Sequence, residues 1–229
     1  MGDFVLVTEG VTDHTILKNV LIGYFKNQRE PEINFDQPDV RRVPSHGGWT
    51  LVIQSLRERK YRQAFQFNQF VTVQIDTDVS GESGFGVPRQ DVNGPMPVEE
   101  FIPRVIDRLK AEIAEEDLVR YSDRFIFAIG VDQLECWLLP LWFKDSKGKQ
   151  TSNCTNRLGE CPQLRDELNR KRPKLPWIRP EEKDQGSYDV ASKGYKKRAT
   201  LIADGSKNPS LAFFIELLDQ QNIILEDTN

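Results

Sequence analysis

The sequence predicts an α/β protein in which a mostly parallel β-sheet is flanked by helices. Short apolar runs alternate along the chain with segments whose apolar side chains recur at helical spacing. The apolar runs lack the regular polar alternation of a sheet with one wet face, which is typical of strands buried on both sides. Strands separated by helices are in turn typical of right-handed crossovers, which place the strands parallel.

We expect four strands before residue 130, at residues 4–8, 40–43, 70–75 and 124–129. The first ends at Glu9 and Gly10, and the third ends at Asp76-Thr77-Asp78. The carboxyl ends of parallel strands meet at one edge of a sheet, where ligands bind. Glu9, Asp76 and Asp78 are therefore expected at the same edge.

The helices are expected between and after these strands. Thr12 or Asp13 offers a side-chain oxygen as the N-cap of the first. Apolar side chains repeat at intervals of three and four residues over 13–25, 49–60 and 98–116, and shorter helices are expected at 162–170 and, in two pieces, at 191–218. A Gly- and Pro-rich loop at 79–97 opens beside the carboxylates, and we predict that it is a mobile lid.

We divide the chain into a core of residues 1–143 and a smaller extension of residues 144–229 that packs on the same sheet. From Arg165 to Arg198 there are eleven Lys or Arg against six Asp or Glu, a net charge of +5, which leaves −9 on the rest of a chain whose total is −4. A basic segment on an acidic body can gather a polyanion, although a solvated surface shows the same pattern.

Several classes of protein are excluded by composition. The chain is 38% hydrophobic and 29% charged, which excludes a disordered tail. The longest strongly apolar stretch, residues 136–143, is too short to cross a bilayer. The N-terminus lacks a signal-peptide pattern, so we expect a cytoplasmic protein. Its three cysteines, Cys136, Cys154 and Cys161, show no zinc-type spacing, and their odd number favours reduced thiols.

The carboxylates at the predicted sheet edge favour a divalent metal. Asp76 and Asp78 are two residues apart, so in an extended segment both can face one cation. Oxygen ligands suit Mg²⁺ or Mn²⁺. Taken singly, Glu9 could cap the following helix and the aspartates could cap a turn. Their combination favours metal, because three converging carboxylates repel one another without a cation.

The same residues resemble the motifs of Toprim domains. Thr8-Glu9-Gly10-Val11-Thr12-Asp13, with Leu17 on the next helix, is similar to the first motif, and Asp76-Thr77-Asp78 is similar to the second. Toprim domains occur in topoisomerases, bacterial primases, recombination mediators and nucleases of the overcoming-lysogenization-defect type. The resemblance covers residues 4–143. It implies a parallel sheet flanked by helices and Mg²⁺-dependent phosphoryl transfer.

Within that family the chain is most similar to the small nucleases of phage defence and mobile elements. The resemblance implies a hydrolase, an endonuclease acting on nucleic acid with DNA favoured, that uses one or two Mg²⁺ or Mn²⁺ ions. It makes Glu9, Asp76 and Asp78 the primary ligands and Asp13, Asp132 and Glu135 the candidates for a second ion. Lys193 or Lys196 would neutralise charge at the reacting phosphate. The expected nucleic-acid contacts are Arg170, Lys171, Arg172, Lys174, Lys197 and Arg198.

Other interpretations stay open for several of these residues. Asp132 could be an N-cap, Glu135 could be a first-turn acid that favours the helix dipole, and the lysines could form a solvated helix face. The chain has no Walker A motif, and larger relatives fuse an ATPase to the nuclease, so the resemblance implies a separately encoded ATPase partner. The alternative function is a Toprim scaffold that binds nucleic acid or a partner protein without cleaving.

Overall fold

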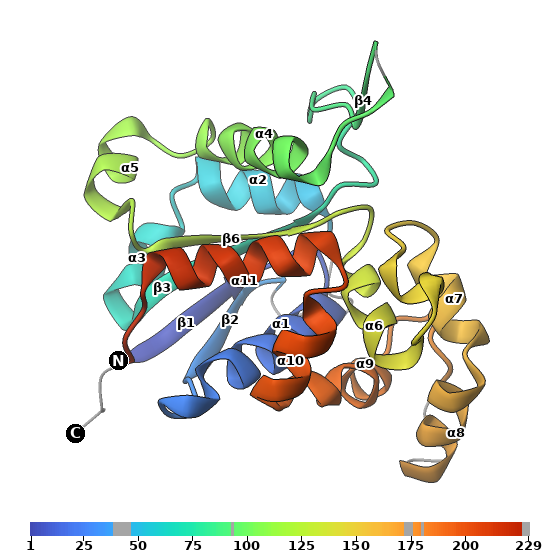
Figure 1. Cartoon of the computed structure of the whole chain (residues 1–229). Helices are drawn as coiled ribbons and strands as arrows, with labels where there is room; N and C mark the ends of the chain where they lie inside the picture. The colour runs from blue at the N-terminus through green and yellow to red at the C-terminus, as the bar shows by residue number, and fades with distance from the viewer. Residues whose placement is uncertain (39–46, 93, 172–175, 180, 226–229) are drawn as a thin grey trace.

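The computed structural model describes residues 1–38, 47–92, 94–171, 176–179 and 181–225. It confirms the α/β class with a parallel sheet flanked by helices (Figure 1). The four strands lie in the order β2-β1-β3-β6, and every neighbouring pair is parallel. Their bounds are Gly2–Val7 for β1, Ile33–Gln37 for β2, Asn68–Asp76 for β3 and Phe125–Gly130 for β6.

The second strand differs from the sequence prediction. Residues 40–43 lie outside the described residues, and the strand beside β1 is β2, in the polar stretch before Pro38. Asn34, Phe35 and Asp36 in its middle are exposed. Because β2 is the outer strand of the sheet, it does not need the apolar run that identifies a buried strand.

Two layers of helices cover the sheet (Figure 1). Side chains alternate between faces along β1: Val5 and Val7 join the apolar cluster of one layer, while Phe4 and Leu6 join that of the other. The first layer contains α2 (Trp49–Arg57), α3 (Tyr61–Phe67), α4 (Val98–Lys110) and α5 (Glu115–Tyr121). The expected helices at 49–60 and 98–116 are thus each followed by a second short helix.

The second layer begins with α1 (Val11–Tyr24), which ends in the short 3₁₀ turn η1 (Phe25–Asn27). Most of the remaining helices of this layer come from residues beyond 143. The remaining helices of this layer are η2 (Leu134–Leu138), α6 (Leu139–Trp142), η3 (Ser146–Lys149), α7 (Cys154–Glu160), α8 (Pro162–Lys171), α9 (Gln185–Ser192), η4 (Lys193–Lys196), α10 (Arg198–Gly205) and α11 (Pro209–Gln221).

The extension and the core share one apolar interior. Phe4 of β1, Tyr188 of α9 and Phe214 of α11 all belong to the same buried cluster. Helix α11 runs along β6 (Figure 1), and the side-chain amide of Gln221 donates to the carbonyl of Phe125 at 2.9 Å. The outer edge of β6 is thereby covered by the C-terminal part of the chain.

One sequence expectation changes with the tertiary structure. A disulfide joins Cys136 to Cys154, whereas we expected reduced thiols, and Cys161 is free and buried. The packing of α7 against η2 brings the two Cα atoms to 5.0 Å, a separation that a disulfide can span and that sequence spacing does not reveal.

Among the described residues, no helix has the length and apolar character needed to cross a membrane.

The loop at 79–97 is tied to the core. Phe85, Val87 and Met96 are buried in the cluster that contains α2 and α4. The guanidinium of Arg108 donates to the carbonyl of Phe85 at 2.8 Å. The segment includes a two-stranded hairpin, β4 (Gln90–Asp91) with β5 (Gly94–Pro95). We predicted that the whole loop moves as a lid. Because of these anchors, such movement is restricted to the exposed parts between them.

Candidate metal centre

The candidate site lies where the strand order of the sheet reverses. The chain passes from β1 outward to β2, and then crosses to the other side of β1 to form β3. In open α/β sheets this switch point leaves a crevice at the carboxyl ends of the two strands. Glu9 follows β1 and Asp76 ends β3, so both lie at this crevice as the sequence predicts.

Three buried carboxylates meet at the crevice. Asp13 lies in the first turn of α1, Asp76 ends β3 and Glu135 lies in the first turn of η2. One oxygen from each can be chosen so that all three atoms lie within 4.8 Å of one another. The exposed fraction of the three residues is 1%, 6% and 0%. They come from three separate segments, so their meeting is a property of the fold.

Each of the three carboxylates is held by one or two hydrogen bonds. The Asp13 Oδ2 atom accepts from the backbone N–H of Gly10 at 2.8 Å. The Asp76 Oδ1 atom accepts from the N–H of Leu134 at 2.9 Å and from the side-chain amide of Gln74 at 2.8 Å. Gln74 also accepts from the N–H of Glu9 at 3.1 Å, so it joins the ends of β1 and β3. Gln74 was not identified from the sequence.

Two of these carboxylates leave one oxygen without a partner. Asp13 Oδ1 and Glu135 Oε2 are both buried and accept no hydrogen bond from the described residues. A buried polar atom without a partner is costly. Two such oxygens beside a third carboxylate fit the hard oxygen ligands of Mg²⁺ or Mn²⁺.

Glu9 adjoins this cluster from the partly open side. Its Oε1 atom accepts from the backbone N–H of Asp76 at 2.6 Å. Burial raises the pKa of Glu9 to about 8, and the charges of Asp13 and Asp78 act in the same direction. The expected pairing of Glu9 with Asp76 at one edge is therefore present in the structure.

Asp78 and Asp132 lie at the mouth of the site. Asp78 is exposed in the turn after β3, and the side-chain amide of Gln133 donates to its Oδ2 atom at 3.4 Å. Asp132 accepts from the N–H of Asn153 at 3.2 Å, and burial with the charge of Asp78 raises its pKa. The structure thus places Asp13 and Glu135 at the centre and Asp78 outside it, the reverse of the expected ranking. The strand ends at Asp76, so Asp78 does not keep the extended alternation that would align the pair.

Among the residues that the structure describes, Lys183 is the lysine that pairs with the buried cluster. Its Nζ atom lies 3.1 Å from Glu135 Oε1, and the hydroxyl of Tyr188 donates to the same oxygen at 2.8 Å. Burial opposes the charged form of Lys183, but the negative charges of Glu135, Asp13 and Asp76 raise its pKa above the ordinary value. Neither Lys183 nor Tyr188 was identified from the sequence.

The lysines that we expected at the reacting phosphate lie elsewhere. Lys196 pairs with Asp189 at 3.2 Å, and Lys193 is exposed on η4. This corrects the expected geometry: residues 193–196 pack against α1, with Tyr195 close to Gly23 near the C-terminal end of that helix. Arg198 donates to the carbonyl of Tyr24 and lies over its ring, so it is committed to a structural contact.

The other residues that we expected to contact nucleic acid differ in their surroundings. Arg170 pairs with Glu167 on α8 at 2.6 Å. Lys171 and Lys197 are exposed and line a hollow beside α1 and α9. Arg172 and Lys174 lie outside the described residues.

The cluster carries more negative charge than its contacts neutralise. Burial raises the pKa of Asp13 to about 7, with the charge of Glu135 as the second cause. Burial and the charge of Asp13 also raise the pKa of Asp76. A divalent cation would remove this repulsion and let all of the carboxylates ionise together.

Comparisons with protein-family models, with curated proteins and with solved structures find no match for this chain. Its function has to be inferred from the geometry of the carboxylates and the residues around them.

Proposed function

We propose that the protein is a divalent-metal-dependent nuclease that hydrolyses phosphodiester bonds, with DNA as the favoured substrate. The observation that carries the proposal is the group of Asp13, Asp76 and Glu135, in which two buried carboxylate oxygens have no hydrogen-bond partner among the described residues. The position of the group at a topological switch point and its similarity to Toprim motifs support the same function.

The residues of the cluster fit Mg²⁺ or Mn²⁺. Asp13, Asp76 and Glu135 would hold an ion, and Glu9 and Asp78, whose charges interact with each other, would help to hold a second one. When bound, such a cation lowers the pKa of water and stabilises charge on phosphate oxygens. The donor set consists of oxygens alone, which suits these hard cations better than softer metals.

The protein's own groups would position the cluster and offset its charge. Gly10 N–H and Leu134 N–H fix two of the carboxylates. Lys183 contacts the cluster through its ammonium, and 39% of its side chain is exposed. A cation in that position would stabilise charge that develops on a phosphate in the transition state. Tyr188 holds Glu135 from the buried side.

The cysteine cluster is a weaker metal candidate. Ligand atoms of Asp132, Cys136 and Cys154 also lie within 4.8 Å of one another. Cys136 and Cys154 form a disulfide, and the thiolate is the form that ligates a metal. Of these two clusters among the described residues, the carboxylate site is therefore the one that supports the proposed chemistry.

Phage defence with a separately encoded ATPase remains a prediction of the resemblance. The nuclease proposal does not depend on it, because the proposed ligands and Lys183 all belong to this chain. A purified protein can therefore be tested alone and then with the product of a neighbouring ATPase gene.

The proposal is tested by incubating the protein with plasmid and single-stranded DNA in Mg²⁺, Mn²⁺ or EDTA. We expect cleavage that needs the metal and that falls at least about 100-fold in Asp76→Asn and Glu9→Gln. Asp123→Asn, which changes an exposed aspartate outside the site, is the matched control and should cleave normally. Cleavage that persists in both site variants would refute the assignment. Binding without any cleavage, alone and with the ATPase, would favour the non-cleaving scaffold.

A further inference from the structure

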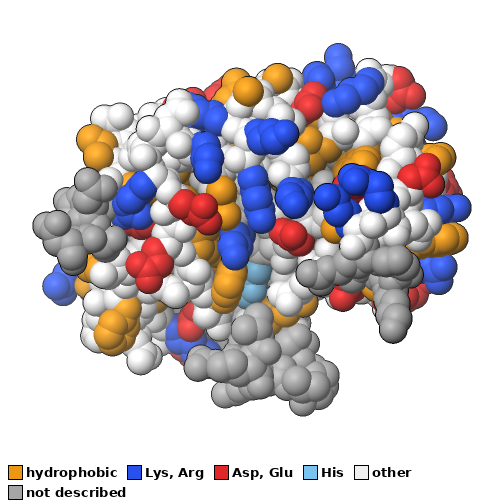
Figure 2. Space-filling view, turned by 90° about the horizontal axis from the view of Figure 1, so that it is seen from below, with side chains coloured by type: hydrophobic (Ala, Val, Ile, Leu, Met, Phe, Trp, Pro, Cys, Tyr) orange, Lys and Arg blue, Asp and Glu red, His pale blue; other side chains and the backbone are white. Residues whose placement is uncertain are grey.

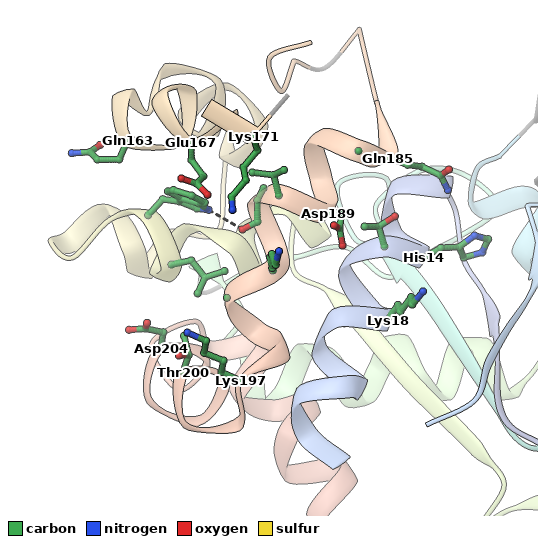
Figure 3. Close-up of a pocket in the computed structure, with 18 of the residues that line it drawn as sticks. His14, Lys18, Gln163, Glu167, Lys171, Gln185, Asp189, Lys197, Thr200 and Asp204 are labelled. Atoms are coloured by element: carbon green, nitrogen blue, oxygen red, sulfur yellow. Dashed lines mark hydrogen bonds between the residues drawn. The ribbon is translucent and has the colours of Figure 1, made fainter. Parts of the chain in front are cut away.

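A lysine-lined groove shares helices α1 and α9 with the carboxylate cluster. It is a hollow of ≈ 1000 Å³ between α1, α6, α8, α9 and α10. Figure 3 shows Lys171 on one wall, Lys197 on the opposite wall, and Lys18 at the end formed by α1. Lys144 and Lys193 also line it. Lys and Arg side chains form a band across this face of the molecule (Figure 2).

The acidic residues of the groove are already paired with cations. Glu167 pairs with Arg170, Asp189 with Lys196, and Asp204 with Lys144 and Lys207. In contrast, Lys18, Lys171, Lys193 and Lys197 have no ion pair among the described residues. The groove therefore keeps a positive potential although the chain as a whole is acidic.

Aromatic side chains lie among these lysines. Trp142 lines the groove, and its indole N–H donates to the carbonyl of Ala191 at 2.9 Å. Phe35, 39% exposed, packs on the ring of His14 with 4.7 Å between centroids. Basic side chains combined with aromatic faces are the usual features of a protein groove that binds a single strand.

The groove and the cluster share two helices. On α1, Asp13 belongs to the cluster and the next residue, His14, lines the groove. On α9, Tyr188 holds Glu135 and the next residue, Asp189, lines the groove. Gln185, which also lines the groove, donates its side-chain amide to the carbonyl of Val11 in the first turn of α1 at 3.2 Å.

We infer that this groove binds single-stranded nucleic acid, with Lys18, Lys171, Lys193 and Lys197 on the phosphates, and that it leads the strand to the carboxylate cluster. The inference rests on the proposed nuclease function and names its substrate form. A walled hollow suits a single strand, which lies inside protein grooves, whereas a duplex is a rod whose own grooves receive protein elements.

The test measures binding by fluorescence anisotropy in EDTA, so that its result does not depend on cleavage. The probes are a labelled single strand of about 12 nucleotides and the duplex of the same sequence. The double variant Lys193→Glu/Lys197→Glu changes two exposed residues of the groove, and Lys193→Gln/Lys197→Gln is a milder second variant. Lys110→Glu, on α4 in the other helix layer, is the matched control.

We expect the single strand to bind more tightly than the duplex and the charge-reversed variant to bind it at least about tenfold more weakly. The plot of log binding constant against log salt concentration should become less steep by about 1.4, since each of the two lost phosphate contacts on a single strand removes about 0.7 from the steepness. Lys110→Glu should bind as the unchanged protein does. Equal or tighter duplex binding, or unchanged binding by both groove variants, would overturn the inference. Intact groove binding without cleavage in any metal would instead refute the nuclease function alone.

Discussion

Lys183 Nζ lies 3.1 Å from Glu135 Oε1, which joins a lysine of the C-terminal extension to a fully buried carboxylate of the core. The contact places a positive charge beside a cluster that otherwise repels itself. It also gives residues beyond 143 a place in the candidate site, in addition to their packing against the sheet. The extension is therefore part of the site as well as of the apolar interior.

Replacement of Lys183 by Ala should lower the cleavage rate by roughly 100-fold, because a cation beside the reacting phosphate acts mainly on the transition state. The measurement is kcat on a single-stranded substrate with saturating Mg²⁺. Lys196→Ala, which removes a lysine paired with Asp189, is the control and should change kcat less than threefold or so. If Lys196→Ala were the damaging change and Lys183→Ala were harmless, the original sequence-based assignment would be preferred.

The stability of the metal-free protein should fall as the pH rises from 6.5 to 8. Burial raises the pKa of Asp13 to about 7 and that of Glu9 to about 8, so the folded state holds protons that the unfolded state has released. Protons therefore stabilise the fold in this window, and their loss should cost about 2 kcal/mol. His14, whose pKa burial lowers to about 4, is neutral in the folded state but half protonated in the unfolded state at pH 6.5, so it opposes this trend by only about 0.4 kcal/mol. Urea unfolding in EDTA at several pH values measures the slope, and a flat or rising profile would contradict the account.

Asp13→Asn should stabilise the metal-free protein at pH 8 and abolish its stabilisation by Mn²⁺. The amide oxygen can still accept from Gly10, while the repulsion with Glu135 is removed. For the unchanged protein, Mn²⁺ at about 100 times its dissociation constant should add about 2.7 kcal/mol. Thermal melts with and without Mn²⁺ measure both effects. Asp189→Asn, outside the cluster, should keep the full response to Mn²⁺, and a response retained by Asp13→Asn would remove this residue from the ligand set.

Gly130→Ala should disturb the site through a single methyl group. A Cβ at this position would lie 2.6 Å from Asp76 Oδ1 and 2.8 Å from the backbone nitrogen of Leu134. We expect a loss of roughly 1–3 kcal/mol in stability and weaker Mn²⁺ binding, since the methyl competes with a carboxylate fixed by Leu134. Gly81→Ala, whose nearest atom would be 3.9 Å away, is the control. Equal melting temperatures and equal Mn²⁺ affinities for the two variants would show that the close contact is unimportant.

The sequence was most informative where the chemistry is local. The strand that ends at Asp76 was predictable because it is a buried apolar run. The turn at Glu9 was predictable because it directly follows another such run. Strand β2 was not predictable in the same way, since an outer strand with exposed polar residues lacks that pattern. Asp13 and Glu135 were recognised as possible ligands, but their central position depends on how α1 and η2 pack.

Lys183 was missed because it is far from the other site residues along the chain. Its partner Glu135 precedes it by 48 positions in sequence. A weak signal was available: Asp184 caps α9 by accepting from the N–H of Ser187 at 2.8 Å, which places Lys183 just before a helix. That pattern locates a helix start, but only the tertiary packing of α9 on α1 aims the lysine at the cluster.

The most direct test of the central claim is a crystal structure of the protein with Mn²⁺, using anomalous scattering to locate the ion. The account predicts an anomalous peak bonded to oxygens of Asp13, Asp76 and Glu135, and no such peak in a crystal of Asp13→Asn prepared in the same way. The crystal should be prepared at a Mn²⁺ concentration that saturates any cleavage activity. A well-ordered site with these three carboxylates close together and no manganese between them would then contradict the account.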